Sequence, residues 1–255
     1  MLNAEPSPVN SRIQSVDRAI ELLEAVAAAG EPETAPVLAD RCGLNRSTAW
    51  RLLATLEHHG LVERDPAGNR YSLGFAVLRL AAAAGYEPLV RLAHPLLRRL
   101  AEATGETANL AVARRLELVY ADQVQAPHVM APNWLGHTVP LHATSTGKAF
   151  LAALPAEELD ALLRPRLERF TDTTITDARA LRAALDGVRA RGYALSHGEL
   201  EPALWGVSAA ARDAAGRPAA IVSVWGSDAR VRDRIDELGA AAAGAARELE
   251  ALLAG

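Results

Sequence analysis

Apolar residues near the start of the chain recur every three or four positions, which predicts a helix. The members of this repeat are Val16, Ile20, Leu23 and Ala27. Ser15 stands where a side chain can cap the first turn, and Gly30 follows the last apolar member of the repeat. Residues 1–14 are small, polar and proline-bearing, so we expect a disordered N-terminal tail of that length.

Two further helical segments follow, with a glycine between them. Thr34 is expected to cap a short helix that ends at Gly43, because glycine readily adopts the left-handed conformation past a helix end. Asn45 can cap a third helix, which runs from Arg46 to about His59. Two short helices joined by a tight turn are typical of a helix-turn-helix.

The third helix has one apolar face and one polar face. At 100° per residue, its apolar members fall within one narrow arc and are expected to face the core. They are Ala49, Leu52, Leu53 and Leu56. The opposite face carries arginine and short hydroxyl residues, which can bond base edges and phosphates. We therefore predict DNA contacts by Arg46, Ser47, Thr48, Trp50 and Arg51.

Alternating apolar and polar residues on both sides of a Pro/Gly turn predict a β-hairpin directly after this helix. A hairpin in that place is a wing, and Arg64 and Arg70 flank its turn, where they could hold phosphates. A winged helix-turn-helix is expected over residues 15–73. Residues 74–86 are expected to form an apolar linker helix suited to packing against a partner.

The remaining chain, residues 87–255, mixes strand patterns and helix patterns without strict alternation. This order favours a largely antiparallel sheet in an α/β (α+β) domain over a parallel dinucleotide-binding fold. The expected strands are Thr107–Ala113, Leu116–Val124, Tyr193–His197, Trp205–Ala211 and Ala219–Trp225. The expected helices are Glu87–Ala103, Thr146–Leu154, Pro155–Leu163, Ala178–Arg191 and Val231–Leu253.

Composition and motifs narrow the function. No apolar run is long enough to span a bilayer and the start lacks a secretory core, so we expect a cytoplasmic protein without a membrane partner. The phosphate-loop pattern fails because His142 stands where its first glycine is required, and the G-x-S-x-G pattern fails at Ala210. Cys42 is expected to pack, and no histidine spacing indicates a metal. We predict no enzyme activity, no cofactor and no metal.

Four segments of the chain resemble the IclR family of bacterial regulators. They are Ser15–Leu23, Gly43–Leu56 with Gly60–Asp65, and Pro140–Ala149, and shorter matches occur at Thr104–Leu110 and Arg191–Tyr193. The resemblance implies a winged helix-turn-helix, a linker helix and an effector-binding domain resembling GAF domains. It also implies a homodimer or tetramer that controls an operator through a small metabolite.

The segment from His142 to Lys148 is expected to open a helix whose N–H groups bind a carboxylate. Lys148 either contributes to binding this carboxylate or is a surface lysine without a role in the site. The family's effector site carries over to Val139, Ser145, Thr146, Ser196, Leu204, Gly206, Ser223 and Trp225. A bulky Trp225 would shrink the pocket or stack on an aromatic ligand, unless Trp205 and Trp225 are both ordinary core residues.

The predicted function is a transcription regulator whose binding to double-stranded operator DNA is controlled by a small organic acid, with aromatic acids among the candidates. Residues 1–73 carry seven arginines against ten carboxylates. This acidic balance keeps one alternative open, in which the winged helix binds protein or mediates dimerisation without reading DNA.

Overall fold

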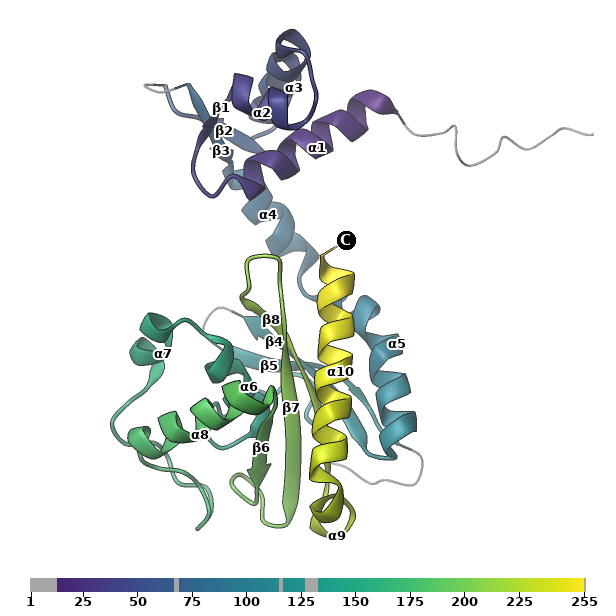
Figure 1. Ribbon diagram of the computed structural model, residues 1–255, viewed down its shortest axis with the longest axis vertical. Helices are drawn as coiled ribbons and strands as arrows, with labels where there is room; N and C mark the ends of the chain where they lie inside the picture. Colours follow the sequence, from purple (N-terminus) through teal and green to yellow (C-terminus); the bar gives the residue numbers. More distant parts are fainter. Residues whose placement is uncertain (1–12, 67–68, 115–116, 127–132, 255) are drawn as a thin grey trace, which may run out of the picture. The chain divides into compact units, whose positions relative to one another are not determined.

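The computed structural model describes residues 13–66, 69–114, 117–126 and 133–254. Contacts divide the chain into two compact units, and the boundary in the sequence lies between Gly85 and Tyr86. Each unit is described by itself (Figure 1). Among the described helices, none combines the length and apolar character needed to cross a bilayer.

The described residues of the first unit form a small three-stranded sheet and four helices. In chain order the elements are α1 (Gln14–Ala28), β1 (Glu33–Thr34), α2 (Ala35–Arg41), α3 (Arg46–His58), β2 (Val62–Arg64), β3 (Arg70–Leu73) and α4 (Phe75–Ala84). The strands lie in the order β1-β3-β2, and both pairs are antiparallel. Leu22, Leu38, Leu53 and Tyr71 are fully buried between them and form the centre of this core.

The predicted turn between α2 and α3 is confirmed. Gly43 has φ of +61°, and Asn45 Oδ1 accepts a hydrogen bond from the N–H of Thr48 at 2.8 Å. The start of α1 differs from the prediction, because the helix begins at Gln14 with Ile13 in the N-cap position, so Ser15 does not cap it. Residues 1–12 of the expected tail lie outside the described residues, as do residues 67–68 at the turn of the wing. Strand β1 was not predicted, since only two residues pair with β3.

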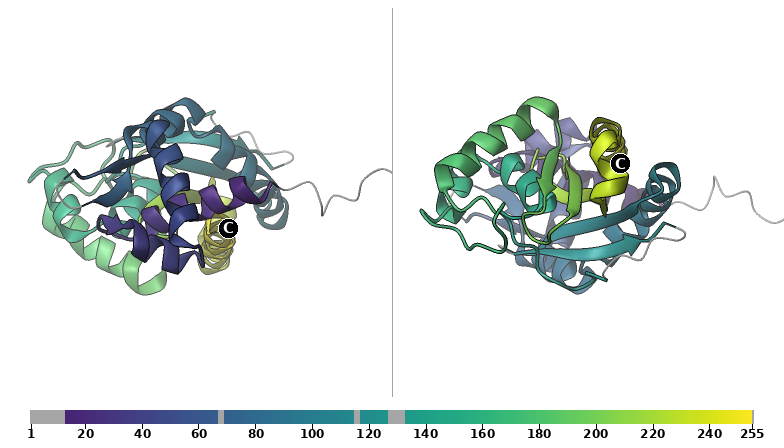
Figure 2. Two further views of the ribbon diagram at one scale, coloured as in Figure 1. Left: turned by 90° about the horizontal axis from the view of Figure 1, so that it is seen from above. Right: turned by 90° about the horizontal axis from the view of Figure 1, so that it is seen from below.

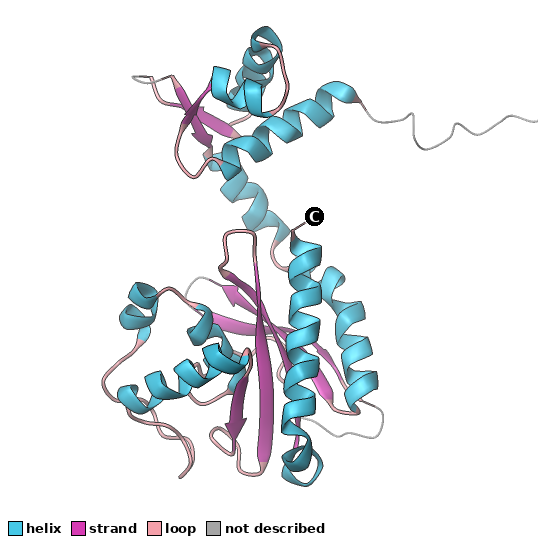
Figure 3. Ribbon diagram, in the orientation of Figure 1, coloured by secondary structure: helices cyan, strands magenta, loops and turns pink. Residues whose placement is uncertain are grey.

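The second unit is one antiparallel sheet with helices on both faces (Figures 2 and 3). Its elements are α5 (Glu87–Thr104), β4 (Thr107–Arg114), β5 (Glu117–Val124), α6 (Ser145–Ala153), α7 (Ala156–Leu162), α8 (Ala178–Arg191), β6 (Ala194–His197), β7 (Leu204–Arg212), β8 (Pro218–Ser227), α9 (Asp228–Val231), a 3₁₀ turn (Arg232–Arg234) and α10 (Ile235–Leu253). The strand order is β5-β4-β8-β7-β6. Helices α5 and α10 cover one face and α6 and α8 the other, with a separate hydrophobic core under each layer.

The predicted helix Val231–Leu253 is wrong at its start. The chain leaves β8 in the four-residue helix α9, passes through a 3₁₀ turn and only then enters α10 at Ile235. Arginines anchor this break, because Arg230 Nε pairs with the buried Glu106 at 2.8 Å and Arg234 donates to the carbonyl of Thr104 at 3.1 Å. These contacts bind the segment to the start of β4, which a periodicity pattern does not encode.

Candidate effector pocket and DNA-binding surface

The outer face of α3 carries the residues predicted to contact DNA. Ala49, Leu53 and Leu56 are buried, whereas Arg46, Ser47 and Arg51 are exposed and Thr48 is half-buried. Ser47 Oγ donates to the capping Asn45 side chain at 2.9 Å. The helix therefore presents hydroxyl and guanidinium groups at its N-terminal end and along its free face, the arrangement in which a recognition helix enters a major groove.

Trp50 joins this face to the wing. Its indole is 48% exposed, and the guanidinium of Arg64 lies over the ring at 5.7 Å from the centroid. This cation–π contact and the Glu57 carboxylate, 3.8 Å from Arg64 Nε, together hold the guanidinium beside α3. Arg70 is placed differently, because it donates to the carbonyl of Pro32 at 3.1 Å and so braces the loop before β1.

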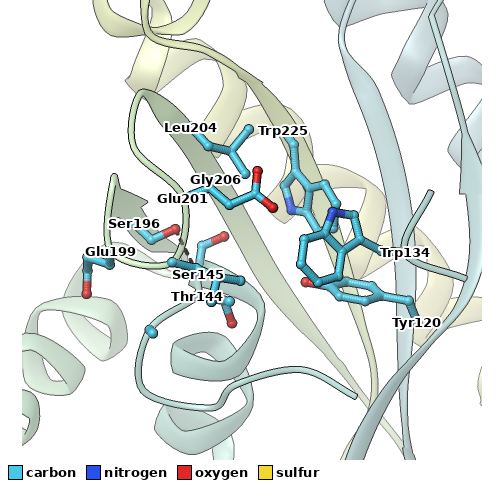
Figure 4. Close-up of a pocket in the computed structure, with 12 residues that line it drawn as sticks. Tyr120, Trp134, Thr144, Ser145, Ser196, Glu199, Glu201, Leu204, Gly206 and Trp225 are labelled. Atoms are coloured by element: carbon cyan, nitrogen blue, oxygen red, sulfur yellow. Dashed lines mark hydrogen bonds between the residues drawn. The ribbon is translucent and has the colours of Figure 1, made fainter. Parts of the chain in front are cut away.

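A pocket opens in the second unit at the start of α6, between the β6–β7 connection and β8 (Figure 4). The space between its walls is about 380 Å³ when the open solvent at its mouth is included, and only a small part of it is enclosed. The side of the pocket at α6 is polar and the opposite side is aromatic. The lining residues are Tyr120, Trp134, Ala143, Thr144, Ser145, Ser196, Glu199, Leu200, Glu201, Leu204, Gly206 and Trp225.

Five hydroxyl groups form a buried network at and behind the polar wall. Ser145 Oγ lies 2.7 Å from Ser208 Oγ, which donates to Ser223 Oγ at 3.0 Å. Thr146 Oγ1 lies 2.8 Å from Ser223 Oγ and accepts from the phenol of Tyr120 at 3.2 Å. Burial raises the pKa of Tyr120, so its hydroxyl stays protonated and remains a donor. These groups satisfy one another and fix the first turn of α6 against the sheet.

Two glycines allow α6 to approach this closely. A Cβ atom at Gly147 would lie 2.3 Å from the backbone of Leu141, and one at Gly206 would lie 2.4 Å from Ser145 Oγ. Gly206 therefore lets β7 pass against the start of the helix, where the N–H of Ser145 donates to Ser196 Oγ at 3.0 Å. Thr144 Oγ1 caps the helix by accepting from the N–H of Gly147 at 2.9 Å. Thr144 and Ser196 contribute this polar wall from different segments.

Three aromatic rings form the opposite wall. Trp225 is edge-on to Tyr120, with centroids 4.9 Å apart at 89°, and to Trp134, with centroids 6.1 Å apart at 90°. Trp225 is 7% exposed and also packs into the core beneath α6, so it serves both wall and core. Trp205 does not line the pocket; its indole N–H donates to Asp228 at 2.6 Å near α9.

Lys148 is neither a surface lysine nor a direct wall residue of the pocket. Its side chain is 4% exposed and its ammonium donates to Glu199 Oε1 and to the carbonyl of Leu195. Burial lowers the pKa of Lys148, and the neighbouring carboxylate opposes that shift. The ion pair ties α6 to the β6–β7 connection and fixes Glu199 in the pocket lining.

The structure brings five of the predicted effector residues to the pocket surface: Ser145, Ser196, Leu204, Gly206 and Trp225. Thr146 and Ser223 lie one layer behind in the hydroxyl network, and Val139 is buried in the core beside Trp225. The prediction missed the lining residues Ala143, Thr144, Glu199 and Leu200. It also missed Tyr120, Trp134 and Glu201. Alternation along β5 could have indicated Tyr120, whereas no local pattern marks Trp134 or Glu201.

A winged helix-turn-helix followed by a sheet unit with a small-molecule pocket is the architecture of a ligand-responsive DNA-binding regulator. Two family models match the chain: the IclR helix-turn-helix domain over residues 15–66 and the bacterial transcriptional regulator IclR C-terminal domain over residues 81–251. The chain belongs to the IclR family; it is a DNA-binding transcription regulator and not an enzyme.

Individual relatives agree with this assignment. The HTH-type transcriptional regulator BhcR of Paracoccus denitrificans is 38% identical over 93% of this chain and 86% of its own. An IclR-family regulator from Rhodococcus sp. superposes with a TM-score of 0.71 at 30% identity, over 99% of this chain and 98% of its own. An IclR homolog from Microbacterium hydrocarbonoxydans, solved in complex with 4-hydroxybenzoate, shares the fold with a TM-score of 0.58 at 24% identity, over 93% and 99%.

Proposed function

We propose that the pocket at the start of α6 binds a small organic acid and that this binding controls the affinity of α3 for an operator. The observation that supports the acid is the polar wall. Thr144, Ser145 and Ser196 supply hydroxyl groups there, and the N-terminus of α6 favours a negative charge. The aromatic wall suits a planar or apolar body on the acid.

The pocket hypothesis can be tested by tryptophan fluorescence with a panel of aliphatic and aromatic acids. Trp134 and Trp225 lie in the pocket wall, so a bound acid should quench or shift their emission. Acids that bind should also change the affinity for DNA from upstream of the protein's own operon. If acids change the affinity for DNA but none of them perturbs the emission of these tryptophans, the effector does not bind at this site.

Operator reading is assigned to Arg46, Ser47, Thr48, Trp50 and Arg51 of α3, with Arg64 and Arg70 of the wing on phosphates. Arg51→Ala should weaken operator binding by about 1–3 kcal/mol and relax discrimination at one base step, because a guanidinium reads a base edge bidentately. Fluorescence anisotropy at fixed salt measures this. Arg98→Ala removes an exposed arginine of α5 and should have no effect; equal losses in both variants would refute the recognition face.

A homodimer, or a tetramer built from dimers, is the expected assembly. One recognition helix buries too little surface to select a single genomic site, so two copies should read a near-palindrome. Helix α4 supports this, because Phe75 and Leu78 lie one turn apart and are 64% and 65% exposed. Sedimentation at micromolar concentration should give a dimer or larger, and Leu78→Glu should shift it towards monomer. A wild-type protein that stays monomeric both without DNA and with DNA would contradict the proposed dimer.

A further inference from the structure

The β6–β7 connection holds one carboxylate over the pocket. Glu201 lines the cavity, and Figure 4 shows its carboxylate directed towards the indoles of Trp225 and Trp134. Within the part of the chain that the structure describes, this side chain has no hydrogen-bond or ion-pair partner. The Glu201 oxygens keep some solvent exposure, so the charge becomes costly when a ligand displaces water from the pocket without compensating it.

The connection is fixed in place on both sides of Glu201. Thr171 Oγ1 donates to the carbonyl of Gly198 and Thr174 Oγ1 to that of Glu199, each at 2.6 Å. Ala203 adopts φ of +60°, a conformation that costs a non-glycine residue free energy and persists where surrounding contacts impose it. Glu201 is therefore presented to the cavity by a braced turn.

The charges around the pocket do not cancel. The other lining carboxylate, Glu199, is neutralised by Lys148, and the pocket lining includes no lysine, arginine or histidine. The start of α6 offers a partial positive charge on one side, whereas Glu201 leaves a full negative charge on the other. A simple acid would be attracted by the start of α6 and repelled by Glu201.

The aromatic wall, like Glu201, favours a positively charged group on the ligand. The faces of indole and phenol rings carry negative potential and attract ammonium groups, and an ammonium beside both a carboxylate and indole faces gains from each.

We propose that the effector is a zwitterion, an organic acid that carries an amino group at its far end, and that Glu201 selects it. This inference rests on the proposed function. The carboxylate of the ligand binds at the start of α6, and its ammonium group pairs with Glu201 against Trp225 and Trp134. Glu201 is thus the residue that distinguishes amino acids from simple acids of equal size.

Two matched series of probes test the proposal by tryptophan fluorescence and thermal shift on the full chain. The first is 4-methylbenzoate, 4-(hydroxymethyl)benzoate and 4-(aminomethyl)benzoate, and the second is pentanoate, 5-hydroxypentanoate and 5-aminopentanoate. In at least one series, the amino compound should bind about tenfold or more tighter than the other two, as a charge-assisted contact implies. Glu201→Gln should abolish that preference and tighten binding of the simple acids. Glu157→Gln removes an exposed carboxylate of α7 that does not line the pocket and should preserve the preference.

The outcomes separate the two levels of the hypothesis. Three results would overturn the selection of a zwitterion without affecting the proposed acid pocket. They are equal binding of acid and amino acid, tighter binding of the hydroxyl compound, and a preference that survives Glu201→Gln. Absence of binding by all six probes at millimolar concentration overturns the zwitterion as well. If instead the probes bind but Leu204→Trp, at the pocket surface, leaves every affinity unchanged, the pocket itself is wrong and the proposed function falls with it.

Discussion

Lys148→Met is expected to lower the free energy of unfolding of the second unit by about 3–5 kcal/mol, the usual cost of removing one partner of a buried ion pair. Lys148 and Glu199 are 4% and 10% exposed, so loss of the ammonium leaves a carboxylate in a dry site. Methionine keeps most of the side-chain volume, and the effect should therefore come from the charge. Urea denaturation followed by tryptophan emission measures the loss, since Trp134, Trp205 and Trp225 report on this unit.

Two comparisons isolate the buried charge. The double variant Lys148→Met with Glu199→Gln should recover most of the stability, because the carboxylate that remained unpaired is now neutral. Arg98→Met breaks an ion pair with Glu102 in which both side chains are more than 60% exposed, and it should cost less than about 1 kcal/mol. A small loss in Lys148→Met, or no recovery in the double variant, would show that the pair does not hold α6 in place.

The helix-turn-helix was predictable because its signals are local. Gly43 marks a helix end because glycine readily adopts a positive φ, and Asn45 marks a helix start because its side chain caps the first turn. Both effects act within a few residues. The buried face of α3 follows from the 3.6-residue repeat, and it appears in the structure with Leu52 only half-buried. The start of α1 was predicted two residues late, since a serine is not required at an N-cap and Ile13 occupies that position.

The pocket was predictable only in part. Sequence reasoning with the family resemblance reached Ser145, Gly206 and Trp225, yet it could not reveal that the partner of Lys148 lies 51 residues further along the chain. Trp134 reaches the pocket because its segment returns beside β5, where the N–H of Gly136 donates to Tyr120 at 2.9 Å. No periodicity marks this return, and the position of Glu201 likewise depends on tertiary contacts to Thr171 and Thr174.

Ser145→Trp is expected to abolish the response of operator binding to an effector while leaving the affinity for DNA unchanged. Ser145 is 1% exposed at the polar wall, and a Cβ atom at Gly206 would already lie 2.4 Å from its hydroxyl. The indole therefore has no space except the cavity that the effector would occupy. An effector shifts the regulator only through its different affinity for the two states, so a blocked pocket should remove a coupling of about 1–3 kcal/mol, or about 5- to 150-fold. Operator titrations with and without the acid selected in the fluorescence panel measure it.

Ser145→Ala separates the loss of space from the loss of the hydroxyl. Alanine keeps the helix start and its N–H contact to Ser196, so the response should persist with effector binding weakened by about 0.5–1.5 kcal/mol. Because a tryptophan at this buried site also strains the packing against β7, Leu204→Trp at the half-buried edge of the cavity provides a second block with less disturbance of the core. Both tryptophan variants should bind operator normally and ignore the acid. An undiminished response in Leu204→Trp and in a folded Ser145→Trp would mean that the effector acts at another site.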